Sequence, residues 1–141
     1  KWLREINLTT WDGFNAYWVP RGWSKEGPIK TQSRIDTPRR GAGVTAGLHP
    51  VAGVAWAPHR GIRRVEVRVD DGPWTEAELS NPLSKDTWVQ WRIDHDFRPG
   101  RHTIAVRATD ATGAVQDEQR RPVAPDGATG WHTVTINTGA I

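Results

Sequence analysis

The chain has 141 residues, no cysteine, and a net charge of +3 from 19 Lys and Arg against 16 Asp and Glu. This length suits one hydrophobic core, and without cysteine the fold has no disulfide, no thiolate metal ligand and no cysteine nucleophile. The sequence lacks an apolar run of about 18 residues, so we expect no membrane contact from this chain. Its arginines are spread among acidic residues, so we expect no binding to nucleic acid.

Residues 1–28 are predicted to form an irregular arm. Five aromatic residues stand in the segment WDGFNAYWVPRGW among Gly, Pro and Asn, and they show neither a helical nor a strand period. Such a segment cannot bury its aromatic rings alone, so we expect it to lie against a larger body. The chain begins at Lys1 and contains no methionine, from which we expect a fragment of a longer protein.

Strands are predicted from residue 29 onward. Residues 29–35 are expected to form the first strand and residues 41–47 a Gly-rich connection. Residues 51–57 form a strand of small residues that places Val54 and Trp56 on one face.

Residues 62–69 show the clearest alternation in the chain. Three valines point to one side and three charged residues to the other: Val65, Val67 and Val69 against Arg64, Glu66 and Arg68. This pattern is typical of a half-buried antiparallel strand. The Asp70-Asp71-Gly72 sequence then predicts a tight turn, because Asp and Gly tolerate a positive φ.

The remaining strands are predicted at similar spacing. They cover residues 74–79, 87–94, 101–110 and 131–137, and a Pro-interrupted crossover at residues 121–130 precedes the last of them. About seven short strands with turns between them predict an all-β, immunoglobulin-like β-sandwich. Without the cysteine pair of antibody domains, the core has to consist of Val, Ile and Trp.

No motif for catalysis or metal binding is found. The five histidines show no metal-ligand spacing, and the Gly-rich segment at 41–47 precedes no helix that would present its N-terminus to a phosphate. The residues alone therefore predict no metal site and no catalytic group in this chain.

Residues 52–79 resemble the C-terminal dimerisation domain of the sulfite-oxidase family of molybdenum-cofactor oxidoreductases. The resemblance lies in the Gly53-Val54-Ala55-Trp56 strand, the hairpin from Val65 to Gly72, and the following Trp74 with Ala77-Glu78-Leu79. It extends over nearly the whole chain, and the scaffold residues that carry it are Gln32, Ser33, Trp56, Asp70, Gly72, Trp74, Asp110, Trp131 and His132.

The resemblance implies a structural role for this chain. Residues 1–28 would be the tail of a pterin-binding domain with a linker, and residues 29–141 the dimerisation domain. In the family, molybdopterin and the cysteine that ligates molybdenum belong to the pterin-binding domain. We therefore expect no cofactor in this chain. The parent oxidoreductase is expected to bind molybdenum-molybdopterin, with Lys1 near it. Two partners are expected: the chain's own pterin-binding domain and a second copy in a homodimer.

The crossover departs from the family pattern. In animal and plant sulfite oxidases this segment resembles Asn-x-Arg-Gly, whose arginine reaches the anionic substrate. Here residues 124–127 read Ala-Pro-Asp-Gly, and Arg120 or Arg121 would replace that arginine only if the loop shifted. The resemblance therefore does not extend to sulfite as the parent's substrate.

A second interpretation remains open at this point. Exposed tryptophans on a β-sandwich can act as platforms for sugar rings, so the chain could be a secreted carbohydrate-binding module that uses Trp74 or Trp88.

Overall fold

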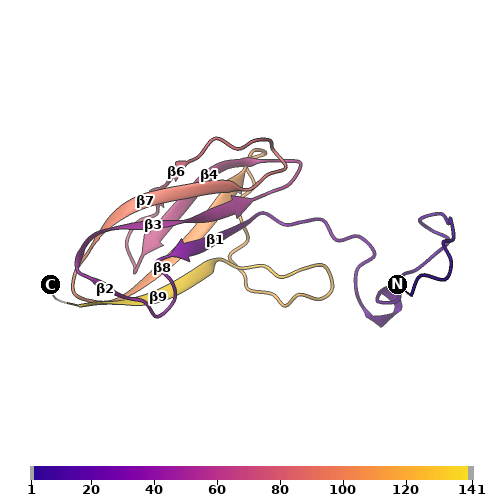
Figure 1. Cartoon of the computed structure of the whole chain (residues 1–141), viewed down its shortest axis with the longest axis horizontal. Helices are drawn as coiled ribbons and strands as arrows, with labels where there is room; N and C mark the ends of the chain where they lie inside the picture. The colour runs from indigo at the N-terminus through magenta and orange to yellow at the C-terminus, as the bar shows by residue number, and fades with distance from the viewer. Residues whose placement is uncertain (1, 140–141) are drawn as a thin grey trace.

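Two β-sheets pack face to face, and the N-terminal arm lies outside them (Figure 1). The computed structural model describes residues 2–139. Its elements are η1 (Val19–Arg21), β1 (Gln32–Thr37), β2 (Gly43–Thr45), β3 (Gly47–Trp56), β4 (Ile62–Val69), β5 (Thr75–Glu76), β6 (Glu78–Leu79), β7 (Val89–Phe97), β8 (Gly100–Asp110) and β9 (His132–Gly139). No helix within this range is long and apolar enough to cross a membrane.

The strands form a four-stranded sheet in the order β1-β3-β7-β6 and a five-stranded sheet in the order β2-β9-β8-β4-β5. Neighbouring strands are antiparallel except β2 and β9, which are parallel. The predicted all-β sandwich is confirmed, but the count of about seven strands was too low, because residues 2–139 contain nine.

Two segments account for the difference. The Gly-rich connection at residues 41–47 contains the short strand β2, which pairs with β9. Residues 74–79, predicted as one strand, change sheets: β5 pairs with β4, whereas β6 pairs with β7. At the change, buried Ala77 donates its N–H to Val65 O at 2.9 Å.

The core lies between the sheets and is mostly aliphatic. Its fully buried members include Val51, Val65, Val106, Ile104 and Ile136. Of the nine tryptophans, all within the described residues, Trp91 is the one with a fully buried side chain. The core therefore contains Val, Ile and Trp as predicted, but most of the indole surface lies outside it.

Trp91 and β1 are brought close to β3 by a glycine. A Cβ atom built on Gly53 would lie 1.8 Å from Arg34 O and 2.9 Å from Trp91 Cζ2. No real Cβ atom fits there, so the small residue at this position sets how closely β1 approaches β3.

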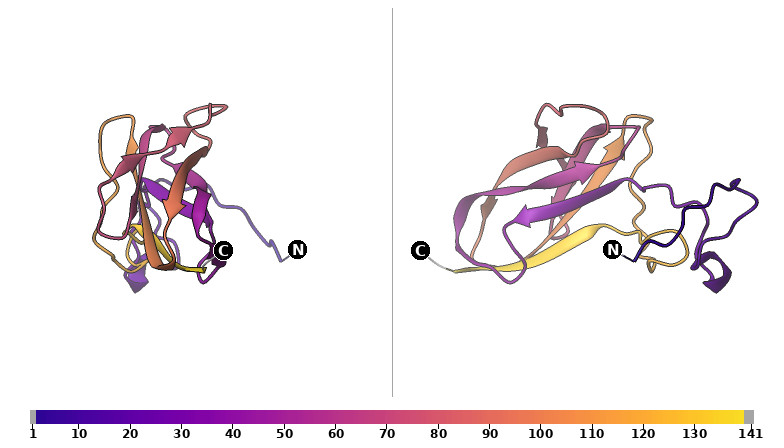
Figure 2. Two further views of the ribbon diagram at one scale, coloured as in Figure 1. Left: turned by 90° about the vertical axis from the view of Figure 1, so that its left-hand side faces the viewer. Right: turned by 45° about the vertical axis from the view of Figure 1, so that its right-hand side comes forward.

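The arm extends away from one end of the sandwich, as the views in Figures 1 and 2 show. Apart from η1 it has no regular structure within the described residues. The Trp18 ring packs edge-on against Tyr17 at 5.1 Å and Trp23 at 6.3 Å between centroids. The exposed fraction reaches 91% for Trp2 and 101% for Leu8.

Candidate functional site

Thr31, just before β1, and the outer edge of β1 are joined by three hydrogen bonds to β8, to the segment that follows β8, and to β9. The bonds are Thr31 Oγ1 to Asp110 Oδ2 at 3.1 Å, Ser33 Oγ to Gln116 Oε1 at 2.6 Å, and Ile35 N to His132 Nδ1 at 3.0 Å. The structure thus aligns three of the residues on which the family resemblance rests: Ser33, Asp110 and His132. They close the side of the sandwich nearest the arm.

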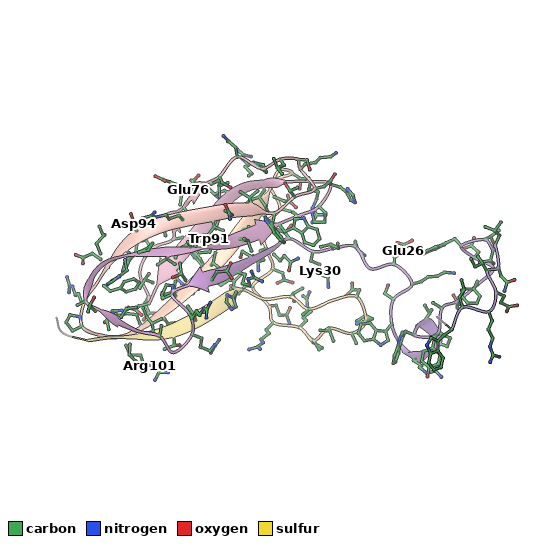
Figure 3. The ribbon with its side chains drawn as sticks, in the orientation of Figure 1. Glu26, Lys30, Glu76, Trp91, Asp94 and Arg101 are labelled. Atoms are coloured by element: carbon green, nitrogen blue, oxygen red, sulfur yellow. The ribbon has the colours of Figure 1, made fainter. Side chains whose placement is uncertain are left out.

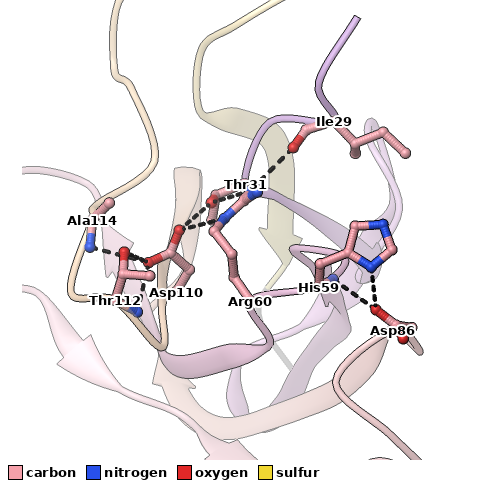
Figure 4. A network of polar contacts seen from close by, with 8 residues as sticks. All are labelled: Ile29, Thr31, His59, Arg60, Asp86, Asp110, Thr112 and Ala114. Atoms are coloured by element: carbon pink, nitrogen blue, oxygen red, sulfur yellow. Dashed lines mark hydrogen bonds and ion pairs between the residues drawn. The ribbon is translucent and has the colours of Figure 1, made fainter.

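Asp110 is the centre of a polar network at the end of β8 (Figure 4). Its side chain is 3% exposed, and Arg60 Nε donates to its Oδ2 at 2.8 Å. Burial disfavours the charge of Asp110, but hydrogen bonds from Thr112, Arg60, Thr31 and the Ala114 amide outweigh burial and lower its pKa to about 2. The carboxylate is therefore ionised under ordinary conditions and holds Arg60 in place.

Arg60 in turn fixes the point where the arm enters the sandwich. Its Nη2 atom donates to Ile29 O at 3.1 Å and to Thr31 Oγ1 at 3.3 Å. Side chains, and not a strand ladder, therefore hold residues 29–31. This is why β1 begins at Gln32, three residues later than predicted.

The crossover between β8 and β9 is bound to the linker that follows the arm. Lys30 Nζ contacts Asp126 Oδ1 at 2.9 Å and donates to Gly127 O at 2.7 Å, and Ser24 N–H donates to Pro125 O at 2.9 Å. Figure 3 shows Lys30 at the junction of arm and sandwich. The linker and the crossover therefore hold each other in position.

A hollow of about 770 Å³ lies between linker and crossover, and we call it the linker groove. Each basic side chain that lines it is paired with an acidic one: Lys30 with Asp126 at 2.9 Å, Arg60 with Asp110 at 2.8 Å, and Arg121 with Asp117 at 2.8 Å. A phosphate ligand needs cations or N–H groups that are not already engaged. The linker groove is therefore a poor match for an anion.

The residues of this chain do not fit the cofactor that the resemblance places in the parent. A molybdenum thiolate bond needs cysteine, which the sequence lacks. The linker groove offers a pterin phosphate no unpaired cation, and among residues 2–139 no three His, Asp or Glu side chains cluster as metal ligands would.

The outward side of β4 and β8 carries stacked arginines and tryptophans, which we call the arginine face: Arg64, Glu66, Arg68, Trp74, Arg107 and Trp131. The Trp74 and Trp131 rings meet edge-on at 4.9 Å between centroids, and the guanidinium groups of Arg107 and Arg68 lie 4.3 and 4.8 Å from the Trp74 centroid. Arg107 Nε also donates to Glu66 at 2.9 Å. This stack covers Trp74, so the ring is not free to act as a sugar platform.

Asp70 shapes the hairpin that follows β4. Its φ is 52°, its N–H donates to Thr103 O at 2.7 Å, and its Oδ1 accepts from Thr103 N–H at 2.8 Å. His102 places Nδ1 2.8 Å from Asp70 Oδ2 and Nε2 2.8 Å from Arg98 O. These two acceptors, Asp70 first, raise the pKa of His102. The turn itself is closed by a hydrogen bond that Gly72 N–H donates to Val69 O at 3.1 Å.

Trp56 and Trp88 lie on the outer side of the four-stranded sheet, next to a hollow of about 730 Å³. Trp56 Nε1 donates to Asp86 O at 2.8 Å, and Trp88 is 66% exposed. Gln32 pairs with Trp56 across β1 and β3 and borders the same hollow.

Three predicted residues remain, namely Lys1, Arg120 and Arg121. Lys1 falls outside the described residues. Arg121 is paired with Asp117, and its backbone forms an isolated bridge with Thr129 in the crossover. The Arg120 backbone passes 3.2 Å from the point where a Cβ of Gly130 would lie.

Sequence reasoning missed Lys30, Arg60 and the stacking of Arg68 and Arg107 on tryptophan. Lys30 and Arg60 lie in loops with no period, so no pattern marks them. Outward-facing arginines on neighbouring strands near a tryptophan are a usable signal for the stack, because guanidinium groups pack well on indole faces.

Residues 28–139 match the family described as the Mo-co oxidoreductase dimerisation domain. No curated protein matches the chain. The sulfane dehydrogenase SoxCD from Paracoccus pantotrophus is similar in structure, with a TM-score of 0.57 and 26% identity over 74% of this chain and 29% of that one. This chain therefore spans less than a third of the length of that relative.

A second solved structure is similar in fold. The fibronectin(III)-like modules of CbhA from Clostridium thermocellum share a TM-score of 0.55 and 17% identity, over 77% of this chain and 98% of theirs. Together with the two stacked sheets, this likeness shows the predicted immunoglobulin-like type of sandwich.

Proposed function

The chain belongs to the family of Mo-co oxidoreductase dimerisation domains, and we propose that it joins two copies of a molybdopterin-dependent enzyme while resting on that enzyme's pterin-binding domain. In this role the chain is a scaffold and carries no catalytic group. The parent's molybdenum-molybdopterin would be held by residues outside this chain, because the residues present here do not fit that group.

One observation carries the proposed contact with the pterin-binding domain: an aromatic arm with nothing to cover it is fixed to the sandwich at its base. The exposed side chains include Trp2, Trp11, Phe14, Tyr17 and Trp18, each at least 58% exposed. Meanwhile Lys30 and Arg60 hold the linker that follows. Apolar patches of this kind mark surfaces that bind another protein body.

The fixed base of the arm also determines which side of the sandwich the pterin-binding domain would face. Because the linker and the crossover hold each other, a domain that binds the arm faces the crossover and the linker groove. The crossover would then form part of the boundary between the two domains, where Arg120 or Arg121 would reach the parent's substrate only if the loop shifted.

Hydrogen exchange tests the contact with the pterin-binding domain. In this chain alone, we expect amides of residues 2–23 to exchange rapidly, and in the longer parent protein we expect them to be protected. Elemental analysis of the same samples should find molybdenum in the parent and none in this chain. Equal exchange of the arm in both proteins would contradict the domain contact, and stoichiometric molybdenum in this chain would contradict the scaffold role.

Sedimentation equilibrium tests the homodimer. The chain should show a reversible monomer–dimer equilibrium at micromolar concentrations. A chain that sediments as a monomer throughout would contradict self-association by this domain.

The alternative of a carbohydrate-binding module is not better supported than the dimerisation domain. Trp74 is covered by arginines, and the likeness to the CbhA modules concerns the fold alone.

A further inference from the structure

We propose that His102 acts as a charged latch: as an imidazolium it fastens the turn after β4 to the turn between β7 and β8, and it releases them when it loses its proton. Both turns lie at the end of the sandwich opposite the arm, where β7 ends at Phe97 and β8 begins at Gly100 (Figure 1). The side chain of His102 is 13% exposed, so it is largely enclosed by the segments that it joins.

Two oxygen atoms flank the imidazole of His102. Nδ1 lies 2.8 Å from Asp70 Oδ2, and Nε2 lies 2.8 Å from Arg98 O. An ionised carboxylate and a backbone carbonyl both accept hydrogen bonds and donate none. A neutral imidazole has one N–H and would turn a lone pair toward one of these oxygens, whereas an imidazolium donates to both. The geometry therefore selects the protonated ring.

Asp70 is ionised and firmly anchored. Its Oδ1 accepts from Thr103 N–H at 2.8 Å, and its own N–H donates to Thr103 O at 2.7 Å. Burial disfavours the charge of Asp70, but the Thr103 amide and then His102 outweigh burial and lower its pKa. The hydrogen bond to Asp70, followed by that to Arg98 O, raises the pKa of His102. The carboxylate and the imidazolium therefore stabilise each other.

A second histidine stands close by and is favoured in its neutral form. The Phe97 ring contacts both imidazoles, at 4.6 Å from His95 and 5.3 Å from His102 between centroids. Burial, followed by the positive charge of His102, lowers the pKa of His95, although Asp70 and Asp96 act in the opposite direction. His102 is therefore the member of this pair that carries the charge.

The other strands at this end bring few further titratable groups. On β3, His49 lies opposite His95 and places Nε2 2.8 Å from Thr45 O. On β9, Ile136 lies opposite the latch, and Thr138 donates its hydroxyl to Arg98 O; neither side chain titrates. The nearby charges on the turns and on β8 are exposed and screened by solvent: Asp71, Arg98 and Arg101.

Loss of the proton would open this end of the sandwich. A neutral His102 keeps one of its two hydrogen bonds, so one turn is no longer held by it. Beneath the turns lie Phe97, which is 2% exposed, and a hollow of about 160 Å³ that Val67, Ile93 and His95 help to line. Because the pKa of His102 is raised, its contribution is complete below about pH 6.5 and is lost as the pH rises through the folded pKa.

Nitrogen-15 NMR of the imidazole rings reads the protonation of His102 in the whole chain. In a titration from about pH 5 to about pH 9, we expect its midpoint to lie above 6.5, with protons on both ring nitrogens below the midpoint. A midpoint at or below 6.5 would overturn the charged latch.

Hydrogen exchange reads the opening. The amides of Asp70 and Thr103 report on the turn after β4, because each donates to the other residue. We expect their protection factors, which are corrected for the intrinsic effect of pH, to fall at least about tenfold as the pH rises through the midpoint of His102. Protection factors that do not change across the midpoint would contradict the release.

Three variants separate the charge from the shape of the latch. His102→Gln does not titrate, so its protection factors should not depend on pH, and the midpoint of His95 should rise because its positive neighbour is gone. Asp70→Asn tolerates the φ of 52° and can donate to Nδ1 of a neutral ring, whose Nε2–H still reaches Arg98 O. The midpoint of His102 should therefore fall while the turns stay protected.

Asp71→Asn is the matched control, because it removes the same charge from the next, exposed residue of the turn. It should leave the midpoint of His102 and the step in protection as in the wild type. A step that persists in both His102→Gln and Asp70→Asn would overturn the latch, since another group would then cause it. Circular dichroism checks the folding of each variant, and if His102→Gln does not fold, Asp70→Asn decides.

Discussion

The Nδ1 atom of His132 accepts a hydrogen bond of 3.0 Å from the backbone N–H of Ile35, and so joins β9 of one sheet to β1 of the other. To accept this bond, the imidazole must be neutral at Nδ1. Burial, followed by the positive charges of Arg40 and Arg34, lowers the pKa of His132 below 6.5, so the neutral ring is favoured.

The contribution of His132 to the stability of the domain is therefore expected to fall on mild acidification, opposite in sign to that of His102, whose pKa is raised. The unfolded chain takes up the His132 proton near pH 6.5, whereas the folded chain does so at a lower pH. The contribution of His132 is complete above the unfolded pKa and is lost as the pH falls toward the folded pKa. Urea unfolding between about pH 7 and about pH 5 measures this loss.

Two variants of His132 separate the bond from the titration. His132→Asn offers an amide oxygen in place of Nδ1 and does not titrate, so its pH dependence should be flatter than that of the wild type. His132→Ala leaves the Ile35 N–H without a partner and should cost about 1–3 kcal/mol at neutral pH. An unchanged pH dependence in His132→Asn would show that other groups cause the acid sensitivity.

Replacement of Gly53 by alanine should destabilise the domain by about 3 kcal/mol or more. The added Cβ would meet the backbone oxygen of Arg34 at 1.8 Å, and backbone atoms cannot move aside as a flexible side chain can. Gly43→Ala is the control, because nothing lies within 4 Å of the corresponding point in β2, and its effect should stay within about 0.5 kcal/mol. Thermal unfolding measures both; equal effects would be inconsistent with this packing.

Asp110→Asn should lower the free energy of unfolding by about 2 kcal/mol at neutral pH. The pKa of Asp110 falls from 3.8 to about 2 on folding, and this shift corresponds to that amount for a side chain so little exposed. In the wild type, the contribution is present above about pH 4 and is lost as the pH falls through about 2. Acid titrations followed by circular dichroism should therefore show a weaker dependence in Asp110→Asn. Exposed Asp71→Asn, the control, should match the wild type.

Lys30→Met should loosen the base of the arm with little effect on global stability. The ion pair with Asp126 is open to solvent and screened by it, so its loss should change the free energy of unfolding little. The Ser24 amide, which bonds to Pro125 O in the same crossover, should exchange several times faster. Arg101→Met is the control on an exposed strand position far from the linker. Unchanged exchange at Ser24 would mean that Lys30 does not hold the crossover.

A double-mutant cycle should detect the stacking of Arg68 on Trp74. The guanidinium lies 4.8 Å from the ring centroid, and such contacts contribute about 0.5–2 kcal/mol. We expect the effects of Arg68→Met and Trp74→Leu on the free energy of unfolding to be non-additive by that amount. Additive effects would mean that the two side chains merely lie side by side.

The sequence was sufficient to predict the long strands, because their alternation is a direct record of burial. Val65 and Val67 face the core and Arg68 the outside, as expected, and the strands around Trp91 and Ile104 follow the same period. The family resemblance is confirmed by the match of residues 28–139.

The remaining features depend on contacts between distant residues, which no local pattern records. The change of sheet at Ala77 is set by which strand lies beside each two-residue piece. The start of β1 is set by Arg60, which lies 28 residues after Gln32 in the sequence. The outward position of Trp131 is set by its packing against Trp74. The composition shows that tryptophan is abundant, but it does not predict on which side of a sheet each ring lies.

The short strands at the margins of the sandwich restrict how copies can add to one another. β2, β5 and β6 have three, two and two residues, and the outer edge of β1 is engaged by His132 and Gln116. Fibres grow when long, unpaired edge strands recruit further chains into one continuous ladder. With two or three residues each, β2, β5 and β6 are too short to serve as templates for such a ladder.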